Sequence, residues 1–524
     1  MIQMTDISIT RNPDALERWA LERPNEVAYR LLPSEISVTW SELERRSRAC
    51  ASLLAARGLK EGDGIAIFLD NHPRYFEIVW AAHRTGLYYT TISRHLKGAE
   101  MLYILQDCGA RVVFCSPSLM DGELLAQVSS VADVVSLDGP MEGASEYEAA
   151  LAEQPLNTVL PVTLQGTDFC YSSGTTGRPK GIKRPLAQAN RHFNADPDSR
   201  TRWKTFDAGT IFLSTAPFYH TAPIRWNMAV MEKGGSCVML ERFDERLALS
   251  AIERYHVTHS QWVPTMFVRL LRLTTDERHR YDLSSLRFAI HAAAPCPVGV
   301  KEQMIAWWGP ILYEFYSGTE LVGRTSLDSH EWLLHKGSVG RPEFGAVHIV
   351  GVDGYELPSG KEGVVYFSGG PVFEYHNDPE KTRQAYNKQG WGTYGDIGYV
   401  DKDGYLYLTD RLANVIISGG VNIYPQEAEG VLAVHPKVKD VAVVGVPNEE
   451  YGEEVKAVVE LWEASDGTAK LADELIASCR KVLSALKCPR SVDFVSKLPR
   501  TESGKLLKRQ VKASYWTSGS AAKI

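Results

Sequence analysis

The chain has 524 residues, of which 44% are hydrophobic and 23% charged. This composition excludes a disordered chain, and the length exceeds one ordinary core, so we expect two or more domains. The net charge of −7 gives no reason to expect nucleic acid or an anionic membrane as the main partner. No apolar run approaches the ~20 residues that span a bilayer, the first residues show no basic region followed by an apolar one, and Cys-x-x-Cys pairs are absent, so we expect a cytoplasmic protein with free thiols.

The first half of the chain alternates short apolar runs with helical patterns. Residues 64–69 and 87–92 are predicted strands, and residues 74–84 between them have helical periodicity. Further predicted strands cover residues 110–115, 210–214, 236–240, 286–290 and 311–315. Strands that alternate with helices indicate βαβ units and mostly parallel sheets, so the predicted fold class is α/β.

The sequence pattern changes after about residue 340. Short strands separated by Gly-rich turns over about 340–410 predict a distorted β-barrel subdomain. A compact α+β unit is then predicted from strands at 441–446 and 455–461 and an amphipathic helix at 471–486. We therefore expect a large domain over residues 1–410, a hinge over 411–414 at Ala413, and a small mobile domain over 415–524.

The run from Tyr171 to Gly181 reads Tyr-Ser-Ser-Gly-Thr-Thr-Gly-Arg-Pro-Lys-Gly. Its glycines let successive backbone N–H groups turn toward one anion, and its hydroxyls and ammonium add donors for phosphate oxygens. A surface turn has a similar composition. The spacing excludes a kinase-type P-loop, because Pro179 and Gly181 stand where that pattern has Gly and Ser or Thr. The run therefore predicts a phosphate loop of another kind.

This run resembles the signature loop of the adenylate-forming superfamily, which includes acyl-CoA synthetases, peptide-synthetase adenylation domains and beetle luciferases. Four later segments resemble further motifs of that family in the same order: 313–320, 390–398, 418–425 and 498–509. The resemblance, most like a fatty- or aryl-acid CoA ligase, implies that ATP converts a carboxylic acid into an acyl-adenylate and pyrophosphate. The CoA thiol would then displace AMP, and Mg²⁺ would assist at the phosphates.

The resemblance also implies roles for individual residues. Lys505 would bridge the substrate carboxylate and the α-phosphate, Glu320 and Thr175 would hold Mg²⁺, and His220 would act at the acid; these four are the expected catalytic residues. Asp396 would accept hydrogen bonds from both ribose hydroxyls. The residues expected to bind the nucleotide or CoA are Ser172, Ser173, Gly174, Thr175, Thr176, Gly177, Lys180, Ala293, Ala294, Pro295, Tyr316, Ser317, Gly318, Thr319, Asp396, Arg411, Gly419, Gly420 and Lys487.

Several positions depart from the usual family pattern. Ser317 and Gly318 exchange the usual order of a Tyr-Gly-x-Thr-Glu motif, and Tyr394 replaces a Thr before Gly395-Asp396. Val421 replaces a frequent Glu, and Ala413 stands where relatives often have Asp or Lys. A hinge only has to absorb backbone rotation and need not be polar.

The acid pocket is expected near the segment Ala216–His220, which resembles the family's Pro-Leu-Phe-His segment. The expected pocket residues are Tyr219, His220, Trp226, Trp262, Val263 and Gly318. These aromatic groups suit a bulky aryl, alicyclic or medium-to-long aliphatic acid, although such clusters usually belong to a core. His220 is nearly as consistent with a buried core histidine. Arg225 would recognise a polar substituent or, as we prefer, form a structural ion pair.

Three other functions remain open. An amide synthetase or a carrier-protein loading ligase would share the first step, and a non-catalytic nucleotide-binding protein would share only the nucleotide site. The Gly419-Gly420 loop and Lys487 favour CoA as the acceptor, and the set of Glu320, Asp396 and Lys505 favours an enzyme. We also allow for a homodimer.

Overall fold

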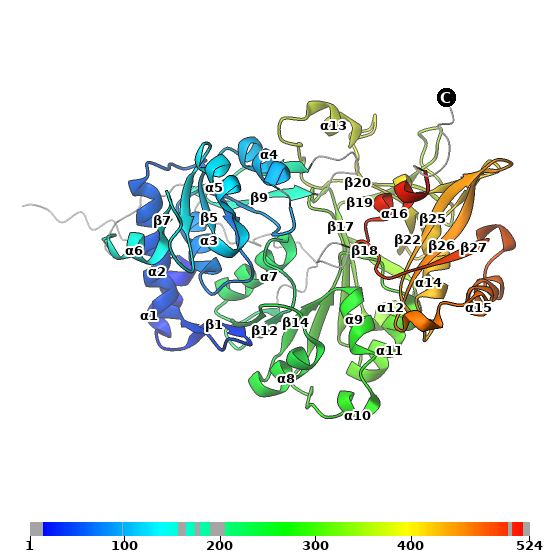
Figure 1. Cartoon of the computed structure of the whole chain (residues 1–524), viewed down its shortest axis with the longest axis horizontal. Coiled ribbons are helices and arrows are strands. Elements are labelled where there is room, and N and C mark those ends of the chain that lie inside the picture. Colours follow the sequence, from blue (N-terminus) through cyan, green and yellow to red (C-terminus); the bar gives the residue numbers. More distant parts are fainter. Residues whose placement is uncertain are drawn as a thin grey trace, which may run out of the picture. The chain divides into compact units, whose positions relative to one another are not determined.

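The computed structural model describes residues 14–96, 98–155, 164–172, 179–188, 205–500 and 506–516. Two compact units are present, one formed by residues 1–197 and 202–258 and the other by 198–201 and 259–524. Each unit combines helices with at least one sheet (Figure 1). No helix in the described ranges is both long and apolar enough to cross a membrane.

The first unit contains a seven-stranded sheet in the order β10-β9-β4-β3-β5-β6-β7. Its neighbouring strands are parallel, except that β9 and β10 form an antiparallel pair. The predicted strands at 64–69, 87–92 and 110–115 are confirmed as β3, β4 and β5. The strands are β3 (Gly64–Phe68), β4 (Tyr88–Thr91), β5 (Ala110–Cys115), β6 (Asp133–Ser136), β7 (Ser145–Glu146), β9 (Thr167–Ser172) and β10 (Lys180–Lys183).

A second group of strands in this unit has the order β12-β13-β1-β2. The first three are parallel, and β1 and β2 form an antiparallel hairpin. These strands are β12 (Ile211–Ser214), β13 (Ser236–Leu240), β1 (Val27–Leu32) and β2 (Ser37–Thr39), and β8 (Leu164–Gln165) pairs with β11 (Ala187–Gln188). The helices are α1 (Ala15–Glu22), α2 (Trp40–Ala56), α3 (Tyr75–Arg84), α4 (Gly98–Cys108), α5 (Gly122–Ser129), α6 (Tyr147–Ala152), α7 (Thr221–Glu232) and α8 (Glu245–Tyr255).

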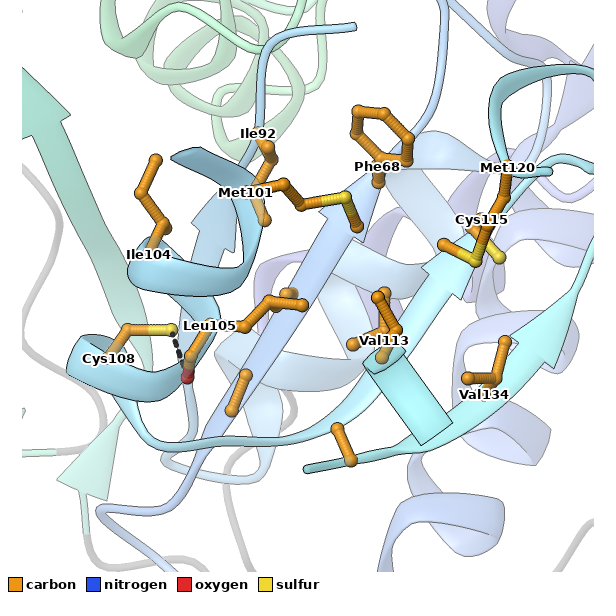
Figure 2. Close-up of a cluster of buried hydrophobic side chains, with 14 of the residues drawn as sticks. Phe68, Ile92, Met101, Ile104, Leu105, Cys108, Val113, Cys115, Met120 and Val134 are labelled. Atoms are coloured by element: carbon orange, nitrogen blue, oxygen red, sulfur yellow. Dashed lines mark hydrogen bonds between the residues drawn. The ribbon is translucent and has the colours of Figure 1, made fainter. Parts of the chain in front are cut away.

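One core cluster of the first unit lies where α4 covers the seven-stranded sheet (Figure 2). Met101, Ile104, Leu105 and Cys108 recur at helical spacing, so one face of α4 is apolar and buried. Phe68 and other strand side chains meet this face. The Cys108 thiol donates to the Leu105 carbonyl at 3.6 Å, which satisfies its one polar group. All eight cysteines are free, and all but Cys296 are buried.

The second unit begins with three parallel strands, β14, β15 and β16, and continues with antiparallel strands in the order β17-β18-β22-β21-β20-β19. The predicted barrel is therefore an open antiparallel run, because the described strands do not close on themselves. The bounds are β14 (His259–Trp262), β15 (Phe288–His291), β16 (Leu312–Tyr316), β17 (Arg324–Asp328), β18 (Ser338–Phe344), β19 (Ala346–Val350), β20 (Gly363–Ser368), β21 (Gly392–Val400) and β22 (Leu406–Arg411).

The C-terminal part of this unit has its own sheet and apolar cluster. Its strands are β23 (Ile416–Ser418), β24 (Val421–Ile423), β25 (Val438–Asn448), β26 (Gly452–Leu461) and β27 (Ser491–Val495). The predicted helix at 471–486 is shorter, because α15 ends at Arg480 and a separate turn of 3-10 helix covers 485–487. The helices of the unit are α9 (Pro264–Leu270), α10 (Thr275–Arg278), α11 (Val298–Trp308), α12 (Ser329–Leu334), α13 (Pro379–Gln384), α14 (Pro425–Leu432), α15 (Ala469–Arg480) and α16 (Lys508–Trp516).

Candidate active site

Three residues expected to bind the nucleotide meet on strands of the second unit. Tyr316 ends β16, Asp396 lies on β21, and Arg411 ends β22 directly opposite Asp396. The Tyr316 hydroxyl donates to Oδ2 of Asp396, and Arg411 Nε lies 3.2 Å from Oδ1. Burial, and then the Asp396 charge, raise the pKa of Tyr316 well above its ordinary value, so this phenol stays a donor. The cluster combines an aromatic face, a carboxylate and a half-exposed guanidinium.

Glu320 follows this cluster in the turn after β16. Its Oε1 accepts a hydrogen bond from the Tyr375 hydroxyl at 2.8 Å. Burial, followed by the Glu320 charge, raises the pKa of Tyr375 above the physiological range, so the phenol remains protonated. A carboxylate oriented by one hydrogen bond and half-buried is a suitable Mg²⁺ ligand, because this ion is usually held by one or two carboxylates beside phosphates.

Two of the departures from the family pattern form one packed unit. The Tyr394 ring lies against Gly318, where an added Cβ would overlap the ring and approach Oε2 of Glu320 to 2.8 Å. The Tyr394 hydroxyl donates to the Gly323 carbonyl at 2.7 Å and lies 3.3 Å from Oγ of Ser317. The shifted glycine therefore makes room for the tyrosine that replaces the usual Thr.

A buried charge pair supports the strands that precede the nucleotide segments. Lys301 on α11 lies 2.6 Å from Oε2 of Glu314 on β16, and both side chains are buried. His291 faces Glu314 in the neighbouring strand at 3.8 Å. Burial, and then the Lys301 charge, lower the pKa of His291 well below its ordinary value, so this ring is neutral. Ala293, two residues on, has a φ of 76°, a left-handed backbone that is uncommon outside glycine.

The C-terminal part of the unit holds the expected CoA residues. Gly419 and Gly420 have φ values of 56° and 80° and form the turn between β23 and β24. Lys487 forms an ion pair with Glu427 at 2.8 Å, so a CoA phosphate would compete with this carboxylate. The backbone of Ala413 lies in the short 3-10 helix Leu412–Asn414.

In the first unit, β9 and β10 flank the predicted phosphate loop. Ser172 pairs with Lys180 across the hairpin, so the two ends of the loop are held in register. The Tyr171 hydroxyl donates to Asp107 on α4 at 2.6 Å. This hydrogen bond fastens the end of β9, just before the loop, to the helix. Residues Ser173–Gly177 of this loop, and Lys505, lie outside the described residues, so their roles remain predictions.

The expected pocket residues lie in both units. His220 precedes α7 as its N-cap residue, and its ring centroid is 4.6 Å from that of Tyr219. Trp226 is buried against Phe206, in the core of the first unit. In the second unit, β14 ends with buried Trp262, which packs against Phe267 and Trp308, and buried Val263 follows as the N-cap residue of α9.

Sequence reasoning assigned no role to two tyrosines that shape the site. Tyr375 orients Glu320, and Tyr394 packs on Gly318 and accepts a hydrogen bond from the Gly323 N–H. The substitution at Tyr394 was visible as a departure from the pattern, but its link to Gly318 required the fold. Tyr375 lies in a loop without a recognisable motif, so no local signal identifies it.

A family model described as "AMP-binding enzyme" matches residues 16–375, and one described as "AMP-binding enzyme C-terminal domain" matches residues 427–505. The chain belongs to this family of AMP-binding enzymes. A feruloyl-CoA synthase from an Amycolatopsis species is 35% identical over 492 residues, which cover 91% of this chain and 94% of that protein. The long-chain-fatty-acid–CoA ligase FadD13 of Mycobacterium tuberculosis is 30% identical over 514 residues, or 95% and 97% of the two chains.

A solved structure, the o-succinylbenzoate CoA synthetase MenE of Bacillus subtilis in complex with its acyl-adenylate intermediate, matches with a TM-score of 0.80. It is 26% identical and covers 96% of this chain and 98% of its own. The predicted superfamily is thereby confirmed, together with the expected activity class of an AMP-forming acid–CoA ligase that uses ATP and CoA.

Proposed function

We propose that this enzyme activates a carboxylic acid with a bulky aryl group and transfers the acyl group to CoA. The Tyr316–Asp396–Arg411 cluster carries the proposal, because it brings a ring face and a carboxylate acceptor together beside a half-exposed guanidinium. A carboxylate can accept two hydroxyl donors at once, as the cis-hydroxyls of a ribose require. The aromatic Tyr219 beside His220 favours an aryl acid, as does the identity to a feruloyl-CoA synthase.

In the first half-reaction, an oxygen of the acid forms a bond to the α-phosphorus while the bond to pyrophosphate breaks. Lys505 would stabilise the charge that gathers between the two reactants, and Thr319 would hydrogen bond to the α-phosphate. Residues 172–177 and Lys180 would hold the departing pyrophosphate with backbone N–H groups and hydroxyls.

In the second half-reaction, the thiolate of CoA attacks the acyl carbon, the thiol proton passes to solvent, and the bond to AMP breaks. Gly419 and Gly420 would leave room for the pantetheine arm, because neither carries a side chain. Lys487 would bind a CoA phosphate in exchange for Glu427. Ala413 would be the point about which the C-terminal part rotates between the half-reactions.

Mg²⁺ belongs to the proposal through Glu320 and Thr175. Glu320 fits this ion by its chemistry, since Tyr375 engages only one of its two oxygens in the described part of the chain. A divalent cation supplies charge neutralisation at the phosphates. We also assign the enzyme to the cytoplasm. Aliphatic acids of fatty acid metabolism are the second proposed substrate class. A homodimer is the assembly to test.

A panel of acids tests the substrate class. Aryl, alicyclic and aliphatic acids are incubated with ATP and Mg²⁺, and acid-dependent pyrophosphate release is measured. Aryl acids should give the highest kcat/KM, and a panel led by aliphatic acids would contradict that assignment. Mass spectrometry of products formed with CoA, or with amines in its place, identifies the acceptor, and an amide product would make the enzyme an amide synthetase.

The role of Lys505 can be separated from that of the fold. Lys505→Ala should abolish adenylate formation, while thioester formation from a preformed acyl-adenylate largely survives. The matched control is Lys512→Ala on α16, which removes an ion pair with Glu453 at 2.7 Å and should leave both steps near the wild-type rate. Equal loss of both steps in Lys505→Ala would contradict the assignment.

A further inference from the structure

Two side chains one turn apart on α7 contact two side chains on one face of β9. Arg225 Nη2 lies 2.8 Å from Oδ2 of Asp168, and Thr221 Oγ1 lies 2.9 Å from Sγ of Cys170. Four helical residues rise about 6 Å and two strand residues about 7 Å, so the two spacings match. The earlier helix residue meets the later strand residue, and α7 therefore runs antiparallel to β9.

This antiparallel packing sets which ends lie together. The N-terminal end of α7, with Tyr219 and His220 just before it, lies toward the C-terminal end of β9. That end of the strand, Tyr171–Ser172, continues directly into the predicted phosphate loop. The segment expected to contact the acid and the strand expected to position the phosphates are thus joined by the two α7–β9 contacts.

Asp168 is the charged centre of this packing. Arg184, which follows β10, lies 2.6 Å from Oδ1, so one buried carboxylate joins β9, the end of β10 and α7. Burial alone would raise the pKa of Asp168, but the Arg225 and Arg184 guanidinium groups lower it well below the ordinary value. The Cys170 thiol also donates to this carboxylate.

The guanidinium of Arg225 is committed to this carboxylate. Its Nε and Nη2 both face Asp168, at 3.3 and 2.8 Å, and the side chain is 13% exposed. Recognition of a polar substituent would have to break this pair inside a dry environment, which is costly. Arg225 is therefore better explained by its pairing with Asp168 inside the protein than by direct recognition of a substituent of the acid.

We propose that Arg225 is a positioning residue, which acts through Asp168 to hold the acid-binding end of α7 beside the strand that leads into the phosphate loop. The inference rests on the proposed function, because it assigns the acid and the phosphates to these two segments. Thr221 contributes the second, weaker contact between α7 and β9, through Cys170. A purely structural ion pair would stabilise the fold without influencing ligand affinity.

Variants of both contacts test this role. Arg225→Met keeps the apolar stem and removes the charge, and Arg225→Lys keeps the charge but loses the two-pronged geometry. Affinity for a Mg²⁺-bound non-hydrolysable ATP analogue is measured by calorimetry, KM for the acid by pyrophosphate release, and folding by circular dichroism and thermal unfolding. Arg225→Met should weaken kcat/KM about 10- to 100-fold, since small displacements of positioned groups cost that much. The Kd of the ATP analogue should also rise in Arg225→Met. Arg225→Lys should recover part of the lost kcat/KM and part of the lost analogue affinity.

The matched control is Arg84→Met. The Arg84 side chain is also largely buried and pairs with Asp14 and Glu44, at 2.9 and 2.6 Å, and neither partner belongs to α7 or β9. This control should lower the unfolding temperature without changing the analogue Kd. Identical behaviour of Arg225→Met and Arg84→Met, with stability lowered and Kd and KM unchanged, would overturn the proposal.

Two further outcomes are distinguishable. If Arg225→Met does not fold, Thr221→Val decides: a rise of about 2- to 4-fold in the analogue Kd supports the proposal, and an unchanged Kd overturns it. If the wild-type enzyme binds the analogue but no acid releases pyrophosphate, the proposed function fails. The comparison of analogue Kd values then still tests whether Arg225 positions the phosphate strand.

Discussion

Two carboxylate–arginine pairs of this chain differ mainly in their exposure to water. The side chains of Asp168 and Arg225 are 5% and 13% exposed, whereas those of Asp396 and Arg411 are 8% and 45% exposed. A buried guanidinium has no solvent to replace a lost partner, but a half-exposed one can exchange its carboxylate for ligand oxygens. The same chemical pair is therefore shielded from water in one unit and half-open to solvent in the other.

Removing the buried carboxylate should have the largest effect. Asp168→Asn leaves two arginines beside a neutral amide, so the free energy of unfolding should fall by about 3–5 kcal/mol. Urea denaturation at neutral pH measures this loss. Glu35→Gln, which breaks the exposed pair with Arg254, is the control and should change stability by less than about 1 kcal/mol. A similar small change in both variants would remove the distinction between the pairs.

The buried pair should also contribute to the acid sensitivity of the fold. The lowered pKa of Asp168 means that its stabilisation is complete above the unfolded-state pKa of about 4 and is lost as the pH falls toward the folded-state value. The stability difference between wild type and Asp168→Asn should therefore shrink between about pH 4 and pH 2. Denaturation curves across this range provide the check, and a constant difference would argue against a charged Asp168.

Asp396→Asn should act on the ligand more than on the fold. Loss of a charged acceptor for the ribose hydroxyls should weaken AMP binding by about 10- to 100-fold. Calorimetric titration with AMP measures this effect. Asp401→Asn changes the same residue type on the adjoining β21–β22 turn, where the carboxylate faces His335, and its AMP affinity should match the wild type. Equal affinities in all three proteins would rule out the ribose role.

The packing of Tyr394 on Gly318 predicts a compensating pair. Gly318→Ala should lower the free energy of unfolding by about 1–3 kcal/mol, because the added Cβ overlaps the ring. Tyr394→Thr removes that ring, so the double variant should recover part of the adenylation rate lost in Gly318→Ala. A double-mutant cycle on adenylation rate and thermal unfolding tests the coupling, and additive losses would show that the two departures are independent.

Arg411→Met should have the smallest effect on the fold. Its pair with Asp396 is half-exposed, so the free energy of unfolding should change by less than about 1 kcal/mol. AMP affinity should fall by about 3- to 10-fold, since one charged contact is lost. Arg411→Met and Arg225→Met are compared by denaturation and calorimetry. A larger stability loss in Arg411→Met than in Arg225→Met would contradict the conclusion that the buried pair contributes more to the fold.

Much of the fold was predictable from local patterns. Continuous apolar runs such as Gly64–Phe68 mark strands buried on both faces, and their alternation with helices implied parallel sheets. The open antiparallel run of β17–β22 was harder to predict, because closure of a sheet depends on the pairing of its edge strands. The end of α15 at Arg480 was also missed, since periodicity continues beyond the residues that remain helical.

The sequence by itself determined the family and the order of its motifs, because glycines, hydroxyls and charges at fixed spacing reflect what phosphate and ribose chemistry requires. It also marked Tyr394 as a departure from the family pattern and left two roles open for Arg225. Only the tertiary structure decided what they do, by bringing Asp168 to Arg225 across 57 residues and Tyr394 to Ser317 across 77. Such pairings depend on how strands and helices pack, and no local spacing encodes them.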